Sequence, residues 1–186
     1  MKRSHISSSH ISNGHISNSI AAALATALAA GSAPAQQSDR WITERAALNS
    51  SGHVEAVAVV AAVNGDALRV YQDARGTLHL SLRLRNGLER LSTSLCPTVQ
   101  VDDDAPITQI PGQLCATDPR GARLTLGEIE DGTIKSPLLL RLMNGTTITA
   151  RFKLNAWGYR SSVFTLTGSK QALFNVIGPD VITDGI

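Results

Sequence analysis

A strict two-residue alternation over residues 77–85 constrains the fold more than any other feature of the sequence. Leu78, Leu80, Leu82 and Leu84 alternate there with His79, Ser81, Arg83 and Arg85. Because successive side chains of a β-strand point to opposite faces, this pattern predicts a strand that buries its leucines and exposes the polar set. Residues 146–154 alternate in the same way, with an apolar face and a face of threonines and cations.

Turn signals separate the other apolar runs. Asn144-Gly145 is typical of a two-residue hairpin turn and predicts that residues 137–143 form a strand paired with 146–154. Further strands are expected at 54–63, 67–72, 91–101, 123–126 and 161–166. We therefore predict a mainly β protein with an antiparallel, immunoglobulin-like β-sandwich.

The end of the chain changes period. Ala172, Leu173 and Val176 fall at helical spacing, with Ser169 as the expected N-cap and Gly178-Pro179 as the stop. The sequence thus predicts one short C-terminal helix.

The first 35 residues have the pattern of a secretory signal peptide. Lys2 and Arg3 precede an apolar run over 20–30, and Ala33-Pro34-Ala35 matches the small-x-small pattern that signal peptidase recognises. The run is about half of the roughly 20 residues that a helix needs to cross a bilayer. We expect cleavage after Ala35 and a periplasmic or secreted protein without a transmembrane anchor.

The predicted organisation has four parts. They are a signal peptide (1–35), an N-terminal extension (36–53), a β-sandwich domain (54–178) and a C-terminal tail (179–186). Two of the 17 basic residues lie in the leader, which leaves 15 basic against 15 acidic residues. Because bulk attraction to nucleic acid needs a basic excess, no nucleic-acid partner is expected.

Cys96 and Cys115 are the two cysteines of the sequence. An even pair in an exported protein predicts one disulfide, with Cα atoms about 4.4–6.8 Å apart. A zinc site would need four ligands, and the predicted mature chain adds only His53 and His79. A reactive Cys–His pair is the remaining alternative.

Catalytic motifs are missing from the sequence: it has no Gly-x-Ser-x-Gly elbow, P-loop, dinucleotide fingerprint or His-Glu-x-x-His. His79 on a polar strand face and His53 in a loop are expected to be solvated, as is the acidic turn 102–104. We therefore expect a protein that is not an enzyme and has no cofactor or metal. The alternative is a hydrolase in which His79 or His53 lies about 3 Å from a nucleophile and from an orienting acid.

The candidate binding surface combines cations and aromatic residues, which are favoured at interfaces. If the strands that carry them are neighbours, the cations form one stripe that fits an anionic partner. Ordinary solvation of the strands and packing of the aromatic residues over a core edge are the alternatives. The six residues are Arg83, Arg85, Arg151, Lys153, Trp157 and Tyr159.

Three segments carry a family resemblance. They are Val101-Asp102-Asp103-Asp104-Ala105-Pro106 before Cys115, Leu138-Leu139-Leu140-Arg141-Leu142-Met143-Asn144-Gly145, and Phe164-Thr165-Leu166-Thr167-Gly168-Ser169-Lys170-Gln171-Ala172-Leu173.

Over about residues 80–177 the sequence resembles the invasion-associated locus B family, which comprises periplasmic or secreted β-sandwich proteins of Gram-negative bacteria. It departs from the family pattern in lacking a second cysteine pair and in having only Trp41-Ile42 at the tryptophan-containing start. The resemblance implies a fold, an extracytoplasmic location, and a role in binding a protein or envelope component. No catalytic residue is implied, and some members are linked to host-cell invasion.

Overall fold

The computed structural model describes residues 40–45, 56–85, 87–108, 114–156 and 158–184, all of which belong to the compact unit Ala35–Ile186. The predicted leader, His53 and Trp157 lie outside the described residues.

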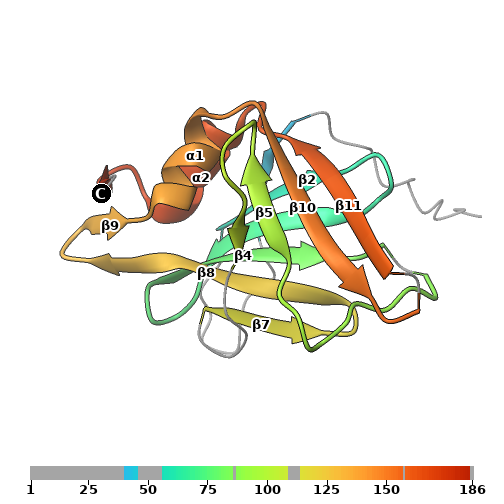
Figure 1. Ribbon diagram of the computed structural model, residues 1–186. Helices are drawn as coiled ribbons and strands as arrows, with labels where there is room; N and C mark the ends of the chain where they lie inside the picture. The colour runs from blue at the N-terminus through green and yellow to red at the C-terminus, as the bar shows by residue number, and fades with distance from the viewer. Residues whose placement is uncertain (1–39, 46–55, 86, 109–113, 157, 185–186) are drawn as a thin grey trace, which may run out of the picture. The chain divides into compact units, whose positions relative to one another are not determined.

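Two sheets and two helices make up the described fold (Figure 1). In the larger sheet the strand order is β1 (Ile42–Arg45), β2 (Ala56–Ala61), β3 (Ala67–Gln72), β4 (Thr77–Arg83), β8 (Gly121–Glu130), β9 (Thr133–Lys135), β12 (Ile182–Asp184), and β7 (Cys115–Asp118) also pairs with β8. In the four-stranded sheet the order is β11 (Gly158–Thr165), β10 (Thr147–Leu154), β5 (Thr98–Val101), β6 (Ile107–Thr108). Neighbouring strands are antiparallel except β9 and β12. The prediction of a mainly β sandwich is confirmed.

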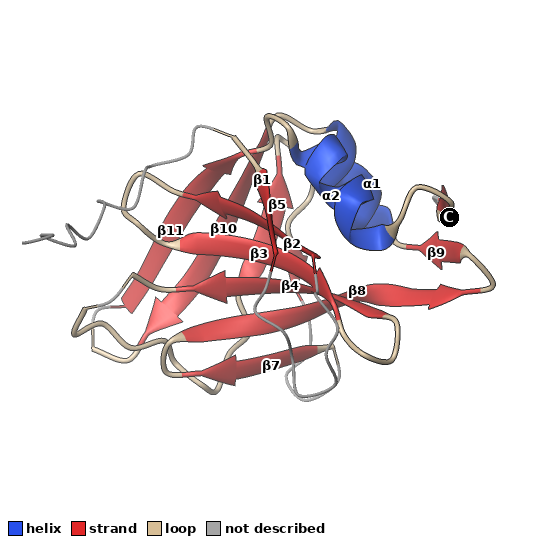
Figure 2. Cartoon of the chain, turned by 180° about the vertical axis from the view of Figure 1, so that it is seen from behind, coloured by secondary structure: helices blue, strands red, loops and turns tan. Residues whose placement is uncertain are grey.

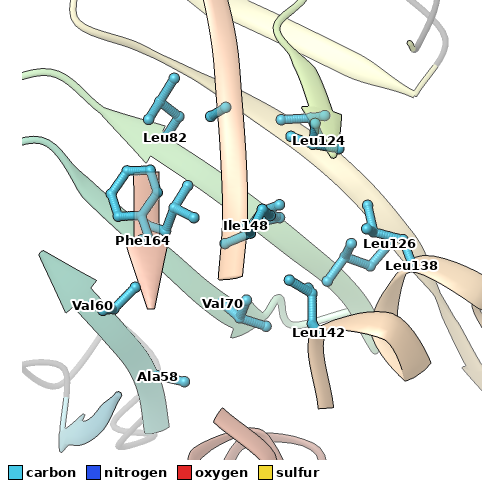
Figure 3. Packing of buried hydrophobic residues seen from close by; sticks show 14 of the residues in the cluster. Ala58, Val60, Val70, Leu82, Leu124, Leu126, Leu138, Leu142, Ile148 and Phe164 are labelled. Atoms are coloured by element: carbon cyan, nitrogen blue, oxygen red, sulfur yellow. The ribbon is translucent and has the colours of Figure 1, made fainter. Parts of the chain in front are cut away.

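The inner faces of the two sheets share one apolar core. Leu78, Leu80 and Leu82 of β4 are each at most 1% exposed, as the alternation predicts. Figure 3 shows Ile148 and Phe164 of the smaller sheet among Val60, Val70 and Leu82 of the larger one. Each fully buried leucine stabilises the fold by about 1.5–3 kcal/mol through its removal from water. This core holds the outer sheet faces in place.

The strand predicted over 137–143 is wrong, because this segment is the helix α1 (Pro137–Asn144). Ser136 is its N-cap and accepts a hydrogen bond from the Leu139 N–H, and proline occupies the first helical turn. Leucine is not branched at Cβ and favours a helix, and one face of α1 is buried. Asn144-Gly145 therefore ends a helix and does not form a hairpin turn. A side chain at Gly145 would lie 2.5 Å from Val101 Cγ1, which explains the glycine.

The predicted C-terminal helix is confirmed as α2 (Ser169–Ile177), which lies beside α1 (Figure 2). Its N-cap is Gly168 and not Ser169, and the expected cap is wrong. Ser169 is buried and donates a hydrogen bond to the Leu142 carbonyl, 2.6 Å away, so it ties α2 to α1. The fold thus has two helices in its described part where the sequence predicted one.

Two strands lie outside the predicted domain limits 54–178, one before the domain and one after it. β1 pairs with β2, and Trp41 before it is only 3% exposed. β12 pairs with β9 in the segment predicted as a tail. Both additions are short, and neither alternates clearly enough to be found by periodicity.

Candidate binding surface

The outer face of the four-stranded sheet carries an exposed group of two cations and one tyrosine. Arg151 and Lys153 alternate with the buried Phe152 on β10, as predicted. Tyr159 of β11 is directly opposite Lys153, and the Arg151 guanidinium carbon lies 4.9 Å from the centre of the Tyr159 ring. A cation over an aromatic face at an exposed site contributes about 0.5–1 kcal/mol. Tyr159 is nevertheless 60% exposed, so most of its ring is open to solvent.

The charges of this face are not neutralised. Among the described residues, neither Arg151 nor Lys153 forms an ion pair, whereas Arg83 pairs with Asp118 at 3.1 Å. An anionic group of a partner can therefore approach these two cations without displacing any acidic side chain that the structure describes.

The predicted stripe of four cations does not form. Arg83 lies on β4, whose neighbours are β3 and β8, and Arg85 follows that strand, while Arg151 and Lys153 belong to the other sheet. Periodicity gives the face of a strand but not its neighbours, and the stripe depended on the neighbours. The structure brings together Arg151, Lys153 and Tyr159, a cluster that we call the β10–β11 patch, and Trp157 lies outside the described residues.

Small polar side chains surround the β10–β11 patch. Ser161 is opposite Arg151, and Thr98 of β5 is opposite Arg151 on the other side. Val163, also on the outer face of β11, is 56% exposed. The face thus combines cations, an aromatic ring, a branched apolar side chain and hydroxyl groups.

His79 is buried, so the prediction of a solvated side chain is wrong. It lies on the outer face of the larger sheet, where the Tyr71 ring is opposite it with 5.4 Å between the ring centres, and only 6% of the residue is exposed. Its Nε2 lies 3.0 Å from Asp73 Oδ2. The alternation correctly placed His79 away from the core, but it could not show that the neighbouring strand covers the ring.

Asp73 has a lowered pKa. Burial alone would raise it, but the hydrogen bond with His79 and those from the N–H groups of Arg75 and Thr77 outweigh burial and stabilise the carboxylate. The pair has the orienting acid that a hydrolase needs. The second ring nitrogen, Nδ1, is buried, and no described residue forms a hydrogen bond with it. No described nucleophile is therefore held by His79.

A depression of about 320 Å³ lies on the same side of the larger sheet. Its lining residues are Tyr71, Ser81, Arg83, Ala116, Thr117, Asp118, Ala122 and Arg123. His79 is not one of them, so the described residues do not bring the histidine and this depression together as a catalytic cleft.

The predicted disulfide between Cys96 and Cys115 is confirmed, with Cα atoms 6.3 Å apart. Cys96 precedes β5 of the smaller sheet, and Cys115 is the first residue of β7 in the larger one. The bond therefore joins the two sheets covalently.

A second connection between the sheets was not predicted. Asp66, in the turn between β2 and β3, is fully buried. Its Oδ2 accepts hydrogen bonds from Arg160 Nη2 and Ser162 Oγ, each 2.6 Å away, and its Oδ1 accepts one from the Arg85 N–H. Arg160 also pairs with Glu89. Arginine at an inward position of β11 was the signal in the sequence, because a buried guanidinium needs an acidic partner.

The acidic turn 102–104 contributes to the structure. Asp102 accepts hydrogen bonds from the N–H groups of Thr146 and Thr147 at the start of β10, and these bonds lower its pKa. Asp104 pairs with Arg141 of α1 at 3.4 Å.

Within the described part of the chain, no three His, Cys, Asp or Glu residues gather as metal ligands, and none of the described helices is long and apolar enough to span a membrane.

Comparison with known proteins gives one structural likeness. No protein-family model matches the sequence, and no curated protein matches it. The structure is similar to the crystal structure of invasion associated protein B from Bartonella henselae, with 18% sequence identity and a TM-score of 0.46. The similarity covers 73% of this chain and 96% of that chain.

Proposed function

We propose that the protein is an exported, non-enzymatic β-sandwich that binds a protein or an envelope component through the outer face of its four-stranded sheet. The observation that carries the proposal is the β10–β11 patch, where two cations without an acidic partner among the described residues lie beside a tyrosine that is 60% exposed. Tyrosine and arginine are enriched at interfaces because they combine a large apolar area with polar contacts.

Export is supported by two independent features. The predicted leader ends in Ala33-Pro34-Ala35, and the disulfide is of a kind that persists in oxidising compartments. The resemblance of residues 80–177 to the invasion-associated locus B family is in line with the same location. N-terminal sequencing of the exported protein should begin at Gln36, and a start at Met1 would overturn this part of the proposal.

Site-specific photo-crosslinking in living cells tests the binding surface. A photoreactive side chain at Tyr159 should give a discrete adduct with a partner. The same group at Lys170, an exposed residue of α2, serves as the control and should not give that adduct. Identical adducts at both positions, or none at Tyr159, would contradict binding through this face.

A hydrolase is the second candidate, and one observation favours it. Asp73 lies 3.0 Å from His79 Nε2, which is the hydrogen-bond distance at which an acid can orient a histidine ring. A fluorophosphonate or another covalent probe of serine hydrolases should not label the protein if the non-enzymatic proposal is correct. Labelling that disappears in His79→Gln but persists in Arg151→Ala would establish the hydrolase instead.

A further inference from the structure

The hydrogen-bond register of β11 fixes which of its backbone groups face away from β10. The Leu166 N–H donates to the Thr146 carbonyl. Every second pair along the two strands, such as Ser162 with Ala150 and Arg160 with Phe152, is therefore hydrogen-bonded through its backbone as well. The alternate residues of β11 direct their N–H and C=O groups to the free edge. These residues are Tyr159, Ser161, Val163 and Thr165.

Trp41 occupies one end of this edge. Its indole N–H donates to the Thr165 carbonyl at 2.8 Å, and its backbone N–H donates to the Thr167 carbonyl at 2.9 Å. Both bonds confirm that the backbone carbonyls of the odd-numbered residues here point away from β10. From Tyr159 to Val163, no described residue forms a hydrogen bond with the outward backbone groups.

β11 is the longest edge strand that the structure describes. It has 8 residues, whereas β1 and β7 have 4 each, β12 has 3 and β6 has 2. Protected edges are short, bulged, interrupted by proline or lined with outward lysines. β11 pairs with β10 over its whole length without a register shift and contains no proline. Figures 1 and 2 both show β11 as the outermost strand of its sheet.

The side chains along this edge indicate the chemistry of an added strand. The residues of an added strand that lie opposite Tyr159 and Val163 would contact exposed apolar surface, since these two side chains are 60% and 56% exposed. The residue of the added strand opposite Ser161 would lie two strand spacings, or about 9.6 Å, from Arg151. Because the side chain of Ser161 is short, the space between the two positions stays open. The Arg151 guanidinium and a glutamate carboxylate on the added strand can therefore reach each other.

We infer that β11 binds an extended segment of another protein as a fifth strand of the four-stranded sheet, with an acidic side chain opposite Ser161 and apolar side chains two residues before and after it. The inference rests on the proposed binding role and names the kind of partner. In this mode backbone hydrogen bonds provide affinity, while alternate side chains provide specificity. A second copy of this chain is a poorer occupant, because its β11 offers serine and valine to Arg151 and no carboxylate.

Amide hydrogen exchange with a defined peptide tests the inference. The probe is acetyl-Thr-Val-Thr-Glu-Thr-Val-Thr-amide, whose valines and glutamate share one face of a strand, and the control peptide has lysine in place of glutamate. In the free protein the amides of Tyr159, Ser161 and Val163 should exchange quickly, while those of Arg160 and Ser162 should be protected. The glutamate peptide should slow the first set, and the lysine peptide should bind about tenfold more weakly.

Two variants separate strand addition from binding to the sheet face. Ser161→Pro removes an outward N–H and no bond to β10, and its matched control Ser161→Ala keeps that N–H. We expect Ser161→Pro to weaken peptide binding about tenfold, and Ser161→Ala to bind as the native protein does. Protection of the Arg160 and Ser162 amides reports that the sheet is intact in both variants.

The outcomes distinguish this inference from the proposed function. Peptide binding that depends on Arg151 but leaves the Tyr159, Ser161 and Val163 amides in fast exchange would overturn strand addition and still support binding to the face. Failure of both peptides to bind would overturn the inference alone, because the photo-crosslinking at Tyr159 needs no added strand. Protection of the three amides in the peptide-free protein at high concentration would assign the edge to self-association and would also overturn it.

Discussion

Arg160 Nη2 donates to Asp66 Oδ2 at 2.6 Å and thereby joins the turn between β2 and β3 to β11 of the other sheet. The side chain of Asp66 is 1% exposed and that of Arg160 is 25% exposed. Their interaction is therefore only weakly screened by solvent. The pair also holds the strand whose outer edge is proposed as the docking edge.

Asp66→Ala should destabilise the fold strongly. It leaves a largely buried guanidinium with fewer acceptors, and loss of one partner of a buried pair costs about 3–5 kcal/mol. Asp118→Ala is the matched control, because it removes the exposed partner of Arg83, and its effect should stay within about 1 kcal/mol. Denaturant unfolding under non-reducing conditions measures both. Equal losses would contradict the central role of Asp66.

Removal of the disulfide should also lower stability without abolishing the sandwich. The double variant Cys96→Ser with Cys115→Ser should lose about 3 kcal/mol of unfolding free energy, the value expected from the entropy of closing a loop of this size. Its far-UV circular dichroism should remain that of a β protein, because the core does not depend on the bond. Titration of the native protein, denatured without reductant, should find no free thiol. Two free thiols per chain would rule out the bond.

The N-cap of α1 offers a test of the helix that replaces a predicted strand. Ser136 is 2% exposed, and its Oγ accepts a hydrogen bond from the Leu139 N–H at 3.2 Å. Ser136→Ala should cost about 1 kcal/mol, and Ser136→Thr should recover part of the loss by restoring a hydroxyl acceptor. Equal stability of all three proteins in thermal unfolding would contradict the assigned cap.

Strict alternation predicted the strands that build the core. The buried leucines of β4 and the faces of β10 follow directly from it, because burial of one sheet face imposes a period of two. Residues 137–143 were predicted wrongly, since a short run of leucines fits a buried strand as well as a helix, and Ser136-Pro137 decided the outcome.

The site could be predicted only in part. The sequence places Arg151 and Lys153 on one face, and Tyr159 follows them closely. That Tyr159 stacks under Arg151 depends on the register of β10 with β11, and that β4 lies in the other sheet depends on topology. The cover over His79 depends on register too, because Tyr71 comes from a neighbouring strand. None of these relationships is encoded in the period of a single strand.

The pH dependence of stability should reveal the lowered pKa of Asp73. The folded pKa lies below the ordinary value of 3.8, because hydrogen bonds with His79 and with two backbone N–H groups outweigh the effect of burial. The unfolded chain therefore takes up a proton at higher pH than the folded one. The contribution of Asp73 is fully present above its unfolded pKa and is lost as pH falls through its folded pKa.

Asp73→Asn should accordingly melt at a lower temperature than the native protein at pH 6, and the difference should shrink as pH falls from about 4 to about 2. Asp103→Asn is the control, because Asp103 is an exposed residue of the 102–104 turn, and its melting temperature should follow the native one at every pH. Thermal unfolding in a buffer series measures all three proteins. A difference for Asp73→Asn that stays constant from pH 6 to about pH 2 would show that the carboxylate is not preferentially stabilised in the folded state.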